Sequence, residues 1–343
     1  MKLSQIIPHL NYKFLSENDL IKAIQEVSIN FTQNRKDIQD YLSDPRLSSA
    51  YTAFYLTTNI PKLEGVFKWM DQAWLEELKE CIFFDIGSGP GTFSFAFRKW
   101  AGQSVSIFQI ENSALMKDQA KKIWDGLYPG EELHQHLLSK NEFTKKKFML
   151  FGHSANEMEF HTIMKYIEDI QPDHILFIEP GTKDFFSLML RIREKLISKG
   201  FEILFPCMES TTCPMSGQSL DWCHQFLYVN HDPEVERLSQ MVKKDRRLLP
   251  ITVHAYSLKK IIGFDGARVV RVFPETKFSF EWQVCDNNVI HRYQVMKRGL
   301  SKYNLDLFSH VKSGDLVYVE IEKIMDQQER VKVKALNNNP IEP

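Results

Sequence analysis

The stretch CIFFDIGSGPGTF, residues 81–93, decides the fold of this 343-residue chain. Its first half is a short, continuous apolar run, which predicts a strand buried on both faces of a parallel sheet. Asp85 lies near the end of that run, and Gly87, Gly89 and Gly91 follow at alternate positions. Glycines let a chain turn sharply and let its backbone approach a ligand closely. The stretch therefore predicts a strand, a ligand-binding loop and the start of a helix.

Four more apolar runs extend this pattern along the chain. They are SVSIFQIE, KFMLFGH, HILFIEP and FEILFPC, which begin at residues 104, 147, 174 and 201. Helix-like segments separate them, and TVHAYSLKK (252–260) is expected to close the sheet. Strands that alternate with helices at this spacing predict an α/β fold with a parallel, doubly wound sheet.

The flanking segments have different patterns. Residues 1–80 place apolar side chains at three- and four-residue spacing and predict a helical region. From residue 263, short strands broken by Gly, Asn and Asp predict a small antiparallel β-barrel. We therefore expect a helical region at 1–80, a Rossmann-like domain at 81–262 with a cysteine-rich insert at 207–224, and a small β-rich domain at 263–335.

Composition indicates a globular protein with an ordinary core. Hydrophobic residues make up 43% of the chain and its net charge is −1, so no overall field favours a polyanionic partner. No apolar run is long enough to span a bilayer, and the N-terminal sequence lacks the apolar block of a secretion signal. The five cysteines are an odd number, which argues against a disulfide framework. We expect a cytoplasmic monomer with no membrane partner.

The glycine loop suggests a nucleoside-containing cofactor. Ligands of open α/β sheets bind beyond the carboxyl ends of the strands, and Glu111, at the end of the second run, can accept hydrogen bonds from both hydroxyls of a ribose. The pattern D-x-G-x-G-x-G followed by this acid resembles the S-adenosylmethionine site of Rossmann-like methyltransferases. The nicotinamide fingerprint and the P-loop both fail to match. The predicted cofactor-binding residues are Asp85, Gly87, Gly89, Gly91 and Glu111. The alternative is that these glycines only form a tight turn.

Polar residues also follow the third run, in the sequence FGHSANEM. Asn156 and Glu157 are placed where they can face the same cleft. Glu157 and His153 are equally compatible with ordinary polar residues at the start of a helix. The sequence is compatible with both interpretations.

Three of the cysteines are close together in sequence. Cys207, Cys213 and Cys223 have the spacing C-x5-C-x9-C, without the C-x2-C pair that zinc ribbons favour. This loose spacing suits an iron–sulfur cluster, and Cys213-Pro214 matches the Cys-Pro found beside such clusters. Cys285 can supply a fourth ligand from the β-rich domain. Cys81 begins a buried strand and is expected in the core. Zinc, or a group of unrelated buried thiols, remain the alternatives.

Several of these motifs together match a known family. FDIGSGPGT, LFIEPGT, PC-x5-CP and DWCH, with a downstream cysteine in a β-rich tail, resemble the methyltransferase-like family associated with the mitochondrial small ribosomal subunit, which also has bacterial members. The resemblance extends from about residue 44 to about residue 318. It implies a class I methyltransferase fold, bound S-adenosylmethionine and contact with small-subunit ribosomal RNA. It also implies a [4Fe–4S] cluster on four cysteines, namely Cys207, Cys213, Cys223 and Cys285.

The sequence leaves catalysis open. Methyl transfer is an in-line displacement, so the enzyme mainly aligns donor and acceptor. The segment HSANEM lacks the Asn-Pro-Pro-Tyr-like loop that usually serves amine acceptors on bases, and the catalytic residues are unknown. Two hypotheses follow: an S-adenosylmethionine-dependent ribosomal RNA methyltransferase, and a non-catalytic ribosome-assembly or RNA-binding factor that uses the fold as a scaffold.

A local surplus of positive charge offers a candidate RNA contact. Residues 241–302 contain thirteen Lys and Arg but only five Asp and Glu. Such a stretch can contact phosphates, and Lys243, Lys244, Arg246 and Arg247 are its densest part. The alternative is an ordinary solvated surface.

Overall fold

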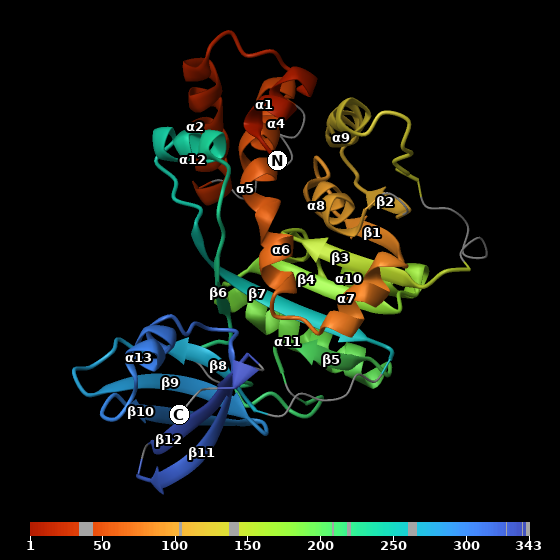
Figure 1. Cartoon of the computed structure of the whole chain (residues 1–343). Helices are drawn as coiled ribbons and strands as arrows, with labels where there is room; N and C mark the ends of the chain where they lie inside the picture. The colour runs from red at the N-terminus through yellow and green to blue at the C-terminus, as the bar shows by residue number, and fades with distance from the viewer. Residues whose placement is uncertain are drawn as a thin grey trace. The chain divides into compact units, whose positions relative to one another are not determined.

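A computed structural model (Figure 1) describes residues 1–33, 44–102, 105–136, 144–207, 209–217, 221–259, 266–326, 328–337 and 339–340. The chain divides into two compact units. The first comprises residues 1–159, 165–172 and 227–249, and the second comprises residues 160–164, 173–226 and 250–343. Within the described residues, no helix is both long enough and apolar enough to cross a membrane.

The first unit contains the N-terminal helices and three strands. Its helices are α1 (Leu3–Ile6), α2 (Glu17–Gln33), α4 (Pro45–Tyr51), α5 (Thr57–Asn59), α6 (Pro61–Phe67), α7 (Gln72–Lys79), α8 (Thr92–Ala101), α9 (Ala114–Leu127) and α12 (Pro233–Met241). Its strands are β1 (Ile82–Ile86), β2 (Ile107–Ile110) and β3 (Lys147–Gly152). Both β2 and β3 pair in parallel with β1, which places β1 between them. Every residue of β1 is buried, as its apolar run predicts.

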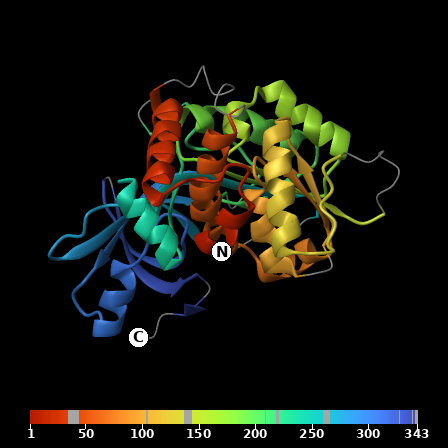
Figure 2. The same ribbon diagram turned by 90° about the horizontal axis from the view of Figure 1, so that it is seen from above.

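A nearly continuous helical stretch runs from α4 to α6. The Asp44 side chain caps its start by accepting hydrogen bonds from two backbone N–H groups of α4. A π-helical segment, Thr52–Leu56, joins α4 to α5. The predicted helical region is thus observed, and α2, α4 and α12 enclose a core that includes Ile24, Phe54 and Leu238. Figure 2 shows α2 in red and α12 in teal side by side.

The second unit contains the remaining strands of the α/β fold. They are β4 (His174–Pro180), β5 (Glu202–Phe205) and β7 (Leu248–Ser257), with helix α11 (Lys183–Ser198) after β4. Strand β7 pairs antiparallel with both β4 and β5 and lies between them. Strand β7 and two further elements, α10 (Phe160–Ile170) and β6 (Gln225–Tyr228), contribute residues to both units. The predicted α/β class is confirmed, and the sheet is mixed because β7 runs antiparallel to its neighbours.

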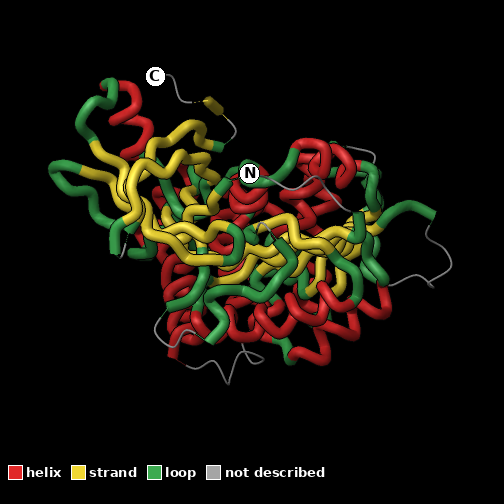
Figure 3. The backbone as a smooth tube through the Cα atoms, turned by 90° about the horizontal axis from the view of Figure 1, so that it is seen from below, coloured by secondary structure: helices red, strands yellow, loops and turns green. Residues whose placement is uncertain are grey.

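The C-terminal part of the second unit is a small β-barrel. Its strands are β8 (Ala267–Val272), β9 (Ser279–Asp286), β10 (Val289–Met296), β11 (Leu316–Ile324) and β12 (Glu329–Leu336), followed by the short β13 (Asn339–Pro340). They are ordered β10-β9-β8-β11-β12, and pairing of β10 with β12 closes the barrel. Helix α13 (Lys302–Ser309), red near the C-terminus in Figure 3, packs Phe308 onto Trp282 in the barrel core. The predicted barrel is confirmed, and α13 is an addition that the strand pattern did not indicate.

Candidate functional site

The glycine loop follows β1 as predicted. Gly87, Gly89 and Gly91 have φ values of 63°, 52° and 89°, in the left-handed region that favours glycine. A Cβ at Gly87 would lie 2.6 Å from the Ser154 Cβ, and one at Gly91 would lie 2.4 Å from the Gln109 Nε2. A Cβ at Gly89 would meet no atom within 4 Å. Two of the glycines therefore allow close packing, whereas Gly89 exposes its backbone to open space.

Glu111 lies directly beside this open position. Its Oε2 accepts a hydrogen bond of 2.8 Å from the Gly89 backbone N–H, and its Oε1 accepts one of 2.8 Å from the Ser113 N–H. Two backbone donors thus fix the orientation of the carboxylate. Each oxygen keeps a lone pair for a further donor, so a diol such as the ribose of a nucleoside can still bind there.

Asp85 has a different role from Glu111. Its side chain is buried, and its Oδ2 accepts hydrogen bonds from the Ser94 backbone N–H (2.8 Å) and the Ser94 hydroxyl (2.7 Å). Burial raises the pKa of Asp85 to about 7, although the hydrogen bonds from Ser94 oppose the increase. The carboxyl group thereby holds the first turn of α8 against the end of β1.

A buried polar cluster lies at the end of β3. The Lys62 Nζ is 2.6 Å from the Nε2 of His153, and Lys62 is only 1% exposed. The guanidinium of Arg246 donates to the Asn59 Oδ1 (3.3 Å) and lies over the ring of Tyr55. Apart from His153, which was left open, sequence reasoning missed this cluster as part of the site. The available signal was the spacing of Tyr51, Tyr55, Asn59 and Lys62 in an otherwise apolar helical stretch.

The four predicted metal ligands all lie in the second unit. Cys207 follows β5, Cys213 and Cys223 lie between β5 and β6, and Cys285 is on β9. Arg268, the cross-strand partner of Cys285, donates from its Nε to the carbonyl oxygen of Pro206 at 3.2 Å. This hydrogen bond ties the strand beside Cys285 to the residue before Cys207.

The remaining cysteine, Cys81, is separate from these four. It lies in the first unit, is 2% exposed, and its Sγ donates to the Glu77 carbonyl oxygen at 3.4 Å. The position agrees with its predicted place in the core.

Electrostatic interactions indicate that the four thiols are neighbours. Burial raises the pKa of Cys223 well above its ordinary value, and the charges of Cys207, Cys213 and Cys285 add to the increase. Burial likewise raises the pKa of Cys285 to about 12, again with contributions from Cys207 and Cys213. Within the described ranges, however, no three His, Cys, Asp or Glu side chains are grouped so that they could hold a metal ion. The four thiols share one neighbourhood without forming the ligand set of a single ion.

Two buried arginines border these thiols. Arg193 is 2% exposed, donates to the carbonyl oxygens of Glu209 (3.2 Å) and Thr211 (2.6 Å), and interacts with the Cys207 thiol. Its Nε is buried without a hydrogen-bond partner in the part of the chain that the structure describes. Burial lowers the pKa of Arg268 to about 10, while Asp315 and the thiols of Cys207 and Cys223 oppose the decrease. The surroundings of the cysteines are therefore electropositive.

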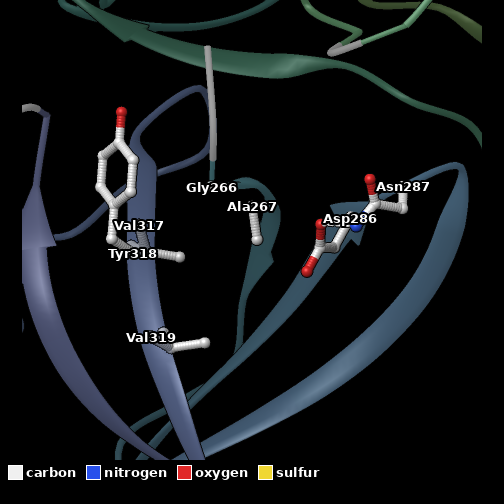
Figure 4. Close-up of a pocket in the computed structure, with 7 residues that line it drawn as sticks. All are labelled: Gly266, Ala267, Asp286, Asn287, Val317, Tyr318 and Val319. Atoms are coloured by element: carbon white, nitrogen blue, oxygen red, sulfur yellow. Dashed lines mark hydrogen bonds between the residues drawn. The ribbon is translucent and has the colours of Figure 1, made fainter.

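A pocket of about 240 Å³ opens in the barrel beside Asp286, the residue that follows Cys285. It is lined by Gly266, Ala267, Asp286, Asn287, Val317, Tyr318 and Val319. In Figure 4, Asp286 and Asn287 face the strand that carries Val317 and Val319. The Asp286 carboxylate also accepts a hydrogen bond from the Tyr293 hydroxyl at 3.1 Å. The pocket contains none of the predicted site residues.

The basic stretch is distributed over both units. Residues 241–249 lie in the first unit and residues 250–302 in the second. Several of its cations have carboxylate partners: Arg247 pairs with Asp245, Arg271 with Asp221, Arg292 with Glu281, and Lys297 with Glu275. Lys260 and Asp265 lie outside the described residues. Among the residues that are described, six cations have no ion pair, namely Lys243, Lys244, Arg246, Lys277, Arg298 and Lys302.

Comparison with solved structures finds several methyltransferases at low similarity. TrmK of M. capricolum, solved with S-adenosylhomocysteine, is 9% identical, with a TM-score of 0.32 over 56% of this chain and 70% of that one. Magnesium protoporphyrin IX methyltransferase (ChlM) of Synechocystis PCC 6803 is 9% identical, with a TM-score of 0.35 over 71% and 99%. A SAM-dependent methyltransferase of Aquifex aeolicus is 13% identical, with a TM-score of 0.30 over 42% and 87%.

Comparison with families gives a more extensive match. No curated protein matches the chain. The model of the family described as "Mitochondrial small ribosomal subunit Rsm22" matches residues 45–304, which is well over half of the sequence and includes the glycine loop and all four clustered cysteines. The predicted resemblance is thereby confirmed, and the chain belongs to the Rsm22 family of the mitochondrial small ribosomal subunit.

Proposed function

We propose that this chain is an S-adenosylmethionine-binding, methyltransferase-like protein that acts on or with small-subunit ribosomal RNA. The observation that carries the proposal is the pairing of Gly89 with Glu111. Gly89 presents backbone to open space, and its N–H orients a carboxylate that retains free acceptor positions. This combination suits a ligand that needs both a close backbone approach and an acceptor for ribose hydroxyls.

Each predicted loop residue then has a distinct role. Gly89 gives the cofactor room, and Glu111 accepts hydrogen bonds from its ribose. Gly87 and Gly91 let the loop pack against Ser154 and Gln109. Asp85 holds the loop and α8 in place through Ser94. When bound, the cofactor supplies an electrophilic methyl group.

The four clustered cysteines are proposed to hold a structural [4Fe–4S] cluster. Support comes from the common neighbourhood of Cys207, Cys213, Cys223 and Cys285 and from the buried guanidiniums beside them, which favour thiolates. A single zinc ion needs four sulfurs at about 2.3 Å and therefore a tightly converged set. A cubane places each cysteine on a different iron and accommodates more widely spaced thiols.

Two observations support RNA as the macromolecular partner. The family is named for the small ribosomal subunit. Lys243 and Lys244, which follow α12, carry charges that no described carboxylate neutralises, so both can contact phosphates. We propose that the RNA contact includes this pair.

A non-catalytic assembly factor is the second candidate. The observation that favours it is that the groups nearest the glycine loop are occupied by structural contacts. The Ser154 hydroxyl donates to the Ile86 carbonyl oxygen at 2.6 Å, Asp85 holds Ser94, and Glu111 holds the loop itself. A scaffold that binds cofactor and RNA without turnover needs no further group.

Methyl transfer separates the two candidates. The protein is incubated with methyl-labelled S-adenosylmethionine and deproteinised small-subunit RNA, and the label in the RNA is counted. The Gly89→Arg variant serves as the control for transfer through the glycine loop. Label that depends on Gly89 establishes an enzyme. Binding of cofactor and RNA without any label establishes the scaffold.

A further inference from the structure

The buried polar cluster beside β3 has features that the proposed function does not yet use. Lys62 on α6 and His153 after β3 are in contact, with 2.6 Å between Nζ and Nε2. An ammonium group can only donate, so the His153 Nε2 accepts and the imidazole is neutral. Burial, followed by the charges of Lys62 and Arg246, lowers the pKa of His153 well below its ordinary value, which agrees with this assignment. Three basic side chains therefore meet in one buried place.

The hydrogen-bonding capacity of Arg246 is only partly used in this cluster. It donates one long hydrogen bond, of 3.3 Å, from Nη2 to the Asn59 Oδ1. Its guanidinium carbon lies 5.6 Å from the centre of the Tyr55 ring. Its Nε is buried without a partner in the described part of the chain. A buried guanidinium with a free donor is costly unless a ligand completes its hydrogen bonding.

The cluster borders the glycine loop. The Ser154 hydroxyl bonds to the Ile86 carbonyl oxygen, and a Cβ on Gly87 would lie 2.6 Å from the Ser154 Cβ. The neighbouring His153 ring stacks on Phe93, the second residue of α8, with 6.3 Å between ring centres. The segment that carries His153 thus packs against both ends of the loop.

Strand order fixes which part of a cofactor would reach the cluster. In the first unit β1 lies between β2 and β3, so Glu111 after β2 and His153 after β3 flank the glycine loop on opposite sides. A nucleoside whose ribose is held by Glu111 extends its 5′ substituent across the loop, toward β3. Tyr51, the last residue of α4, interacts electrostatically with Glu157, Glu111 and Arg246.

We propose that Arg246, supported by Lys62, binds the α-carboxylate of the amino-acid portion of S-adenosylmethionine. This inference rests on the proposed function of the glycine loop. Arginine and carboxylate form paired, charge-assisted hydrogen bonds. The free donor at Nε and the donor at Nη2 supply such a pair, and the neutral His153 holds the Lys62 ammonium nearby.

Calorimetry with three ligands tests the carboxylate assignment. S-adenosylhomocysteine carries the carboxylate, decarboxylated S-adenosylmethionine keeps the amino group without it, and 5′-methylthioadenosine lacks both. Arg246→Gln should weaken S-adenosylhomocysteine binding by about 10- to 100-fold, the range for a hydrogen bond to a charged group. Binding of the other two ligands should change less than about 2-fold. Arg246→Lys keeps the positive charge but lacks the paired donors of the guanidinium, so it should lose an intermediate amount of affinity for S-adenosylhomocysteine.

Arg247→Gln is the matched control. Arg247 is the next residue in sequence, is exposed, and pairs with Asp245 at 2.7 Å, so its loss should leave all three affinities unchanged. Equal losses for all three ligands in Arg246→Gln would overturn the subsite and assign Arg246 a structural role. An unchanged affinity for S-adenosylhomocysteine would also overturn it.

Two further outcomes distinguish a failure of the carboxylate subsite from a failure of the proposed cofactor site at the glycine loop. If Arg246→Gln lowers RNA affinity while S-adenosylhomocysteine still binds normally, the anion is an RNA phosphate and the carboxylate assignment is wrong. If 5′-methylthioadenosine and S-adenosylhomocysteine both fail to bind the wild-type protein, the proposed function of the glycine loop fails, and the subsite fails with it.

Discussion

Arg268 and Cys285 face each other across strands β8 and β9, and Arg268 also bonds to the carbonyl oxygen of Pro206. This relationship brings a cysteine of the barrel to the loop that begins at Cys207, 78 residues earlier in sequence. Two further contacts join the same regions: Arg271 pairs with Asp221, and the Asn288 side chain donates to Glu209 at 2.7 Å. Polar contacts therefore position the barrel next to the cysteine loop before any metal is considered.

Replacement of Cys285 by serine should abolish or weaken the proposed cluster. Protein purified without oxygen should be brown and contain about four iron atoms per chain, and Cys285→Ser should lose colour, iron and thermal stability together. Stability falls because a cluster that binds only the native state stabilises that state. Iron and zinc analysis accompanies the spectra.

Cys81→Ser is the control for that experiment. A serine hydroxyl can still donate to the Glu77 carbonyl oxygen, and the colour should persist. A colourless protein that contains zinc would replace the cluster with a zinc site. A protein with neither metal, even after reconstitution, would remove the metal site altogether.

Gly89→Arg should abolish binding of S-adenosylmethionine. The added side chain fills the open space beside Glu111, while no neighbouring atom lies within 4 Å of its Cβ to disturb the fold. Gly130→Arg is matched, because Gly130 also has positive φ (84°) and an unobstructed Cβ. Both variants carry a similar backbone cost, on the order of 1 kcal/mol. Calorimetry measures the affinity of each variant for S-adenosylmethionine, and circular dichroism verifies that both are folded. Equal affinities in Gly89→Arg and Gly130→Arg would refute the assignment of the cofactor pocket.

Asp85 should make stability depend on pH. The folded state raises the pKa of its carboxyl from 3.8 to about 7 through burial, so folded protein holds this proton more tightly than unfolded protein. The free energy of unfolding therefore falls as pH rises from about 4 to about 7. Relative to Asp85→Asn, the wild type should gain about 2 kcal/mol between pH 7.5 and pH 5.5. Denaturant titrations at both values measure the difference, and parallel pH profiles of the two proteins would contradict the assignment.

Lys243 and Lys244 should contribute to RNA binding through phosphates. The double alanine variant should bind RNA more weakly, with a similar loss for different sequences. Each lost contact should reduce the slope of log affinity against log salt by about 0.7 for single-stranded RNA. Arg247→Ala is the comparison, since Asp245 already neutralises that cation. A salt slope that the double variant leaves unaltered would show that this pair does not contact RNA.

The sequence predicted the fold well because each signal was local. The apolar run at 81–86, the glycines after it and the broken strands beyond residue 263 each specify structure within a few residues. Strand β2 was predicted from residue 104 and begins at Ile107. The direction of β7 and its place between β4 and β5 were beyond prediction, since strand pairing is decided by tertiary packing.

The site was predicted only where residue type is diagnostic. Glycines and cysteines have few roles, so Gly89 and Cys285 could be selected from spacing and family resemblance. Lysine and arginine are usually on the surface, and Arg246 was therefore assigned to a phosphate-binding stretch, although its Nε is buried. Its contacts with Asn59 and Tyr55 join segments more than 180 residues apart, which no local pattern specifies.

The π-helical segment Thr52–Leu56 sets which face of the following helix carries Asn59 and Lys62. A π-turn holds one residue more than an α-turn, and each residue of an α-helix advances the chain by about 100°. A regular α-helix of the same length would therefore turn Asn59 and Lys62 by about that angle relative to α4, away from Arg246 and His153. The helix and its composition would survive, but the polar cluster would not. A family member with one residue fewer between Tyr51 and Lys62 should therefore have a regular α-helix here and keep the polar cluster, whereas an unchanged length without the π-turn should lose it.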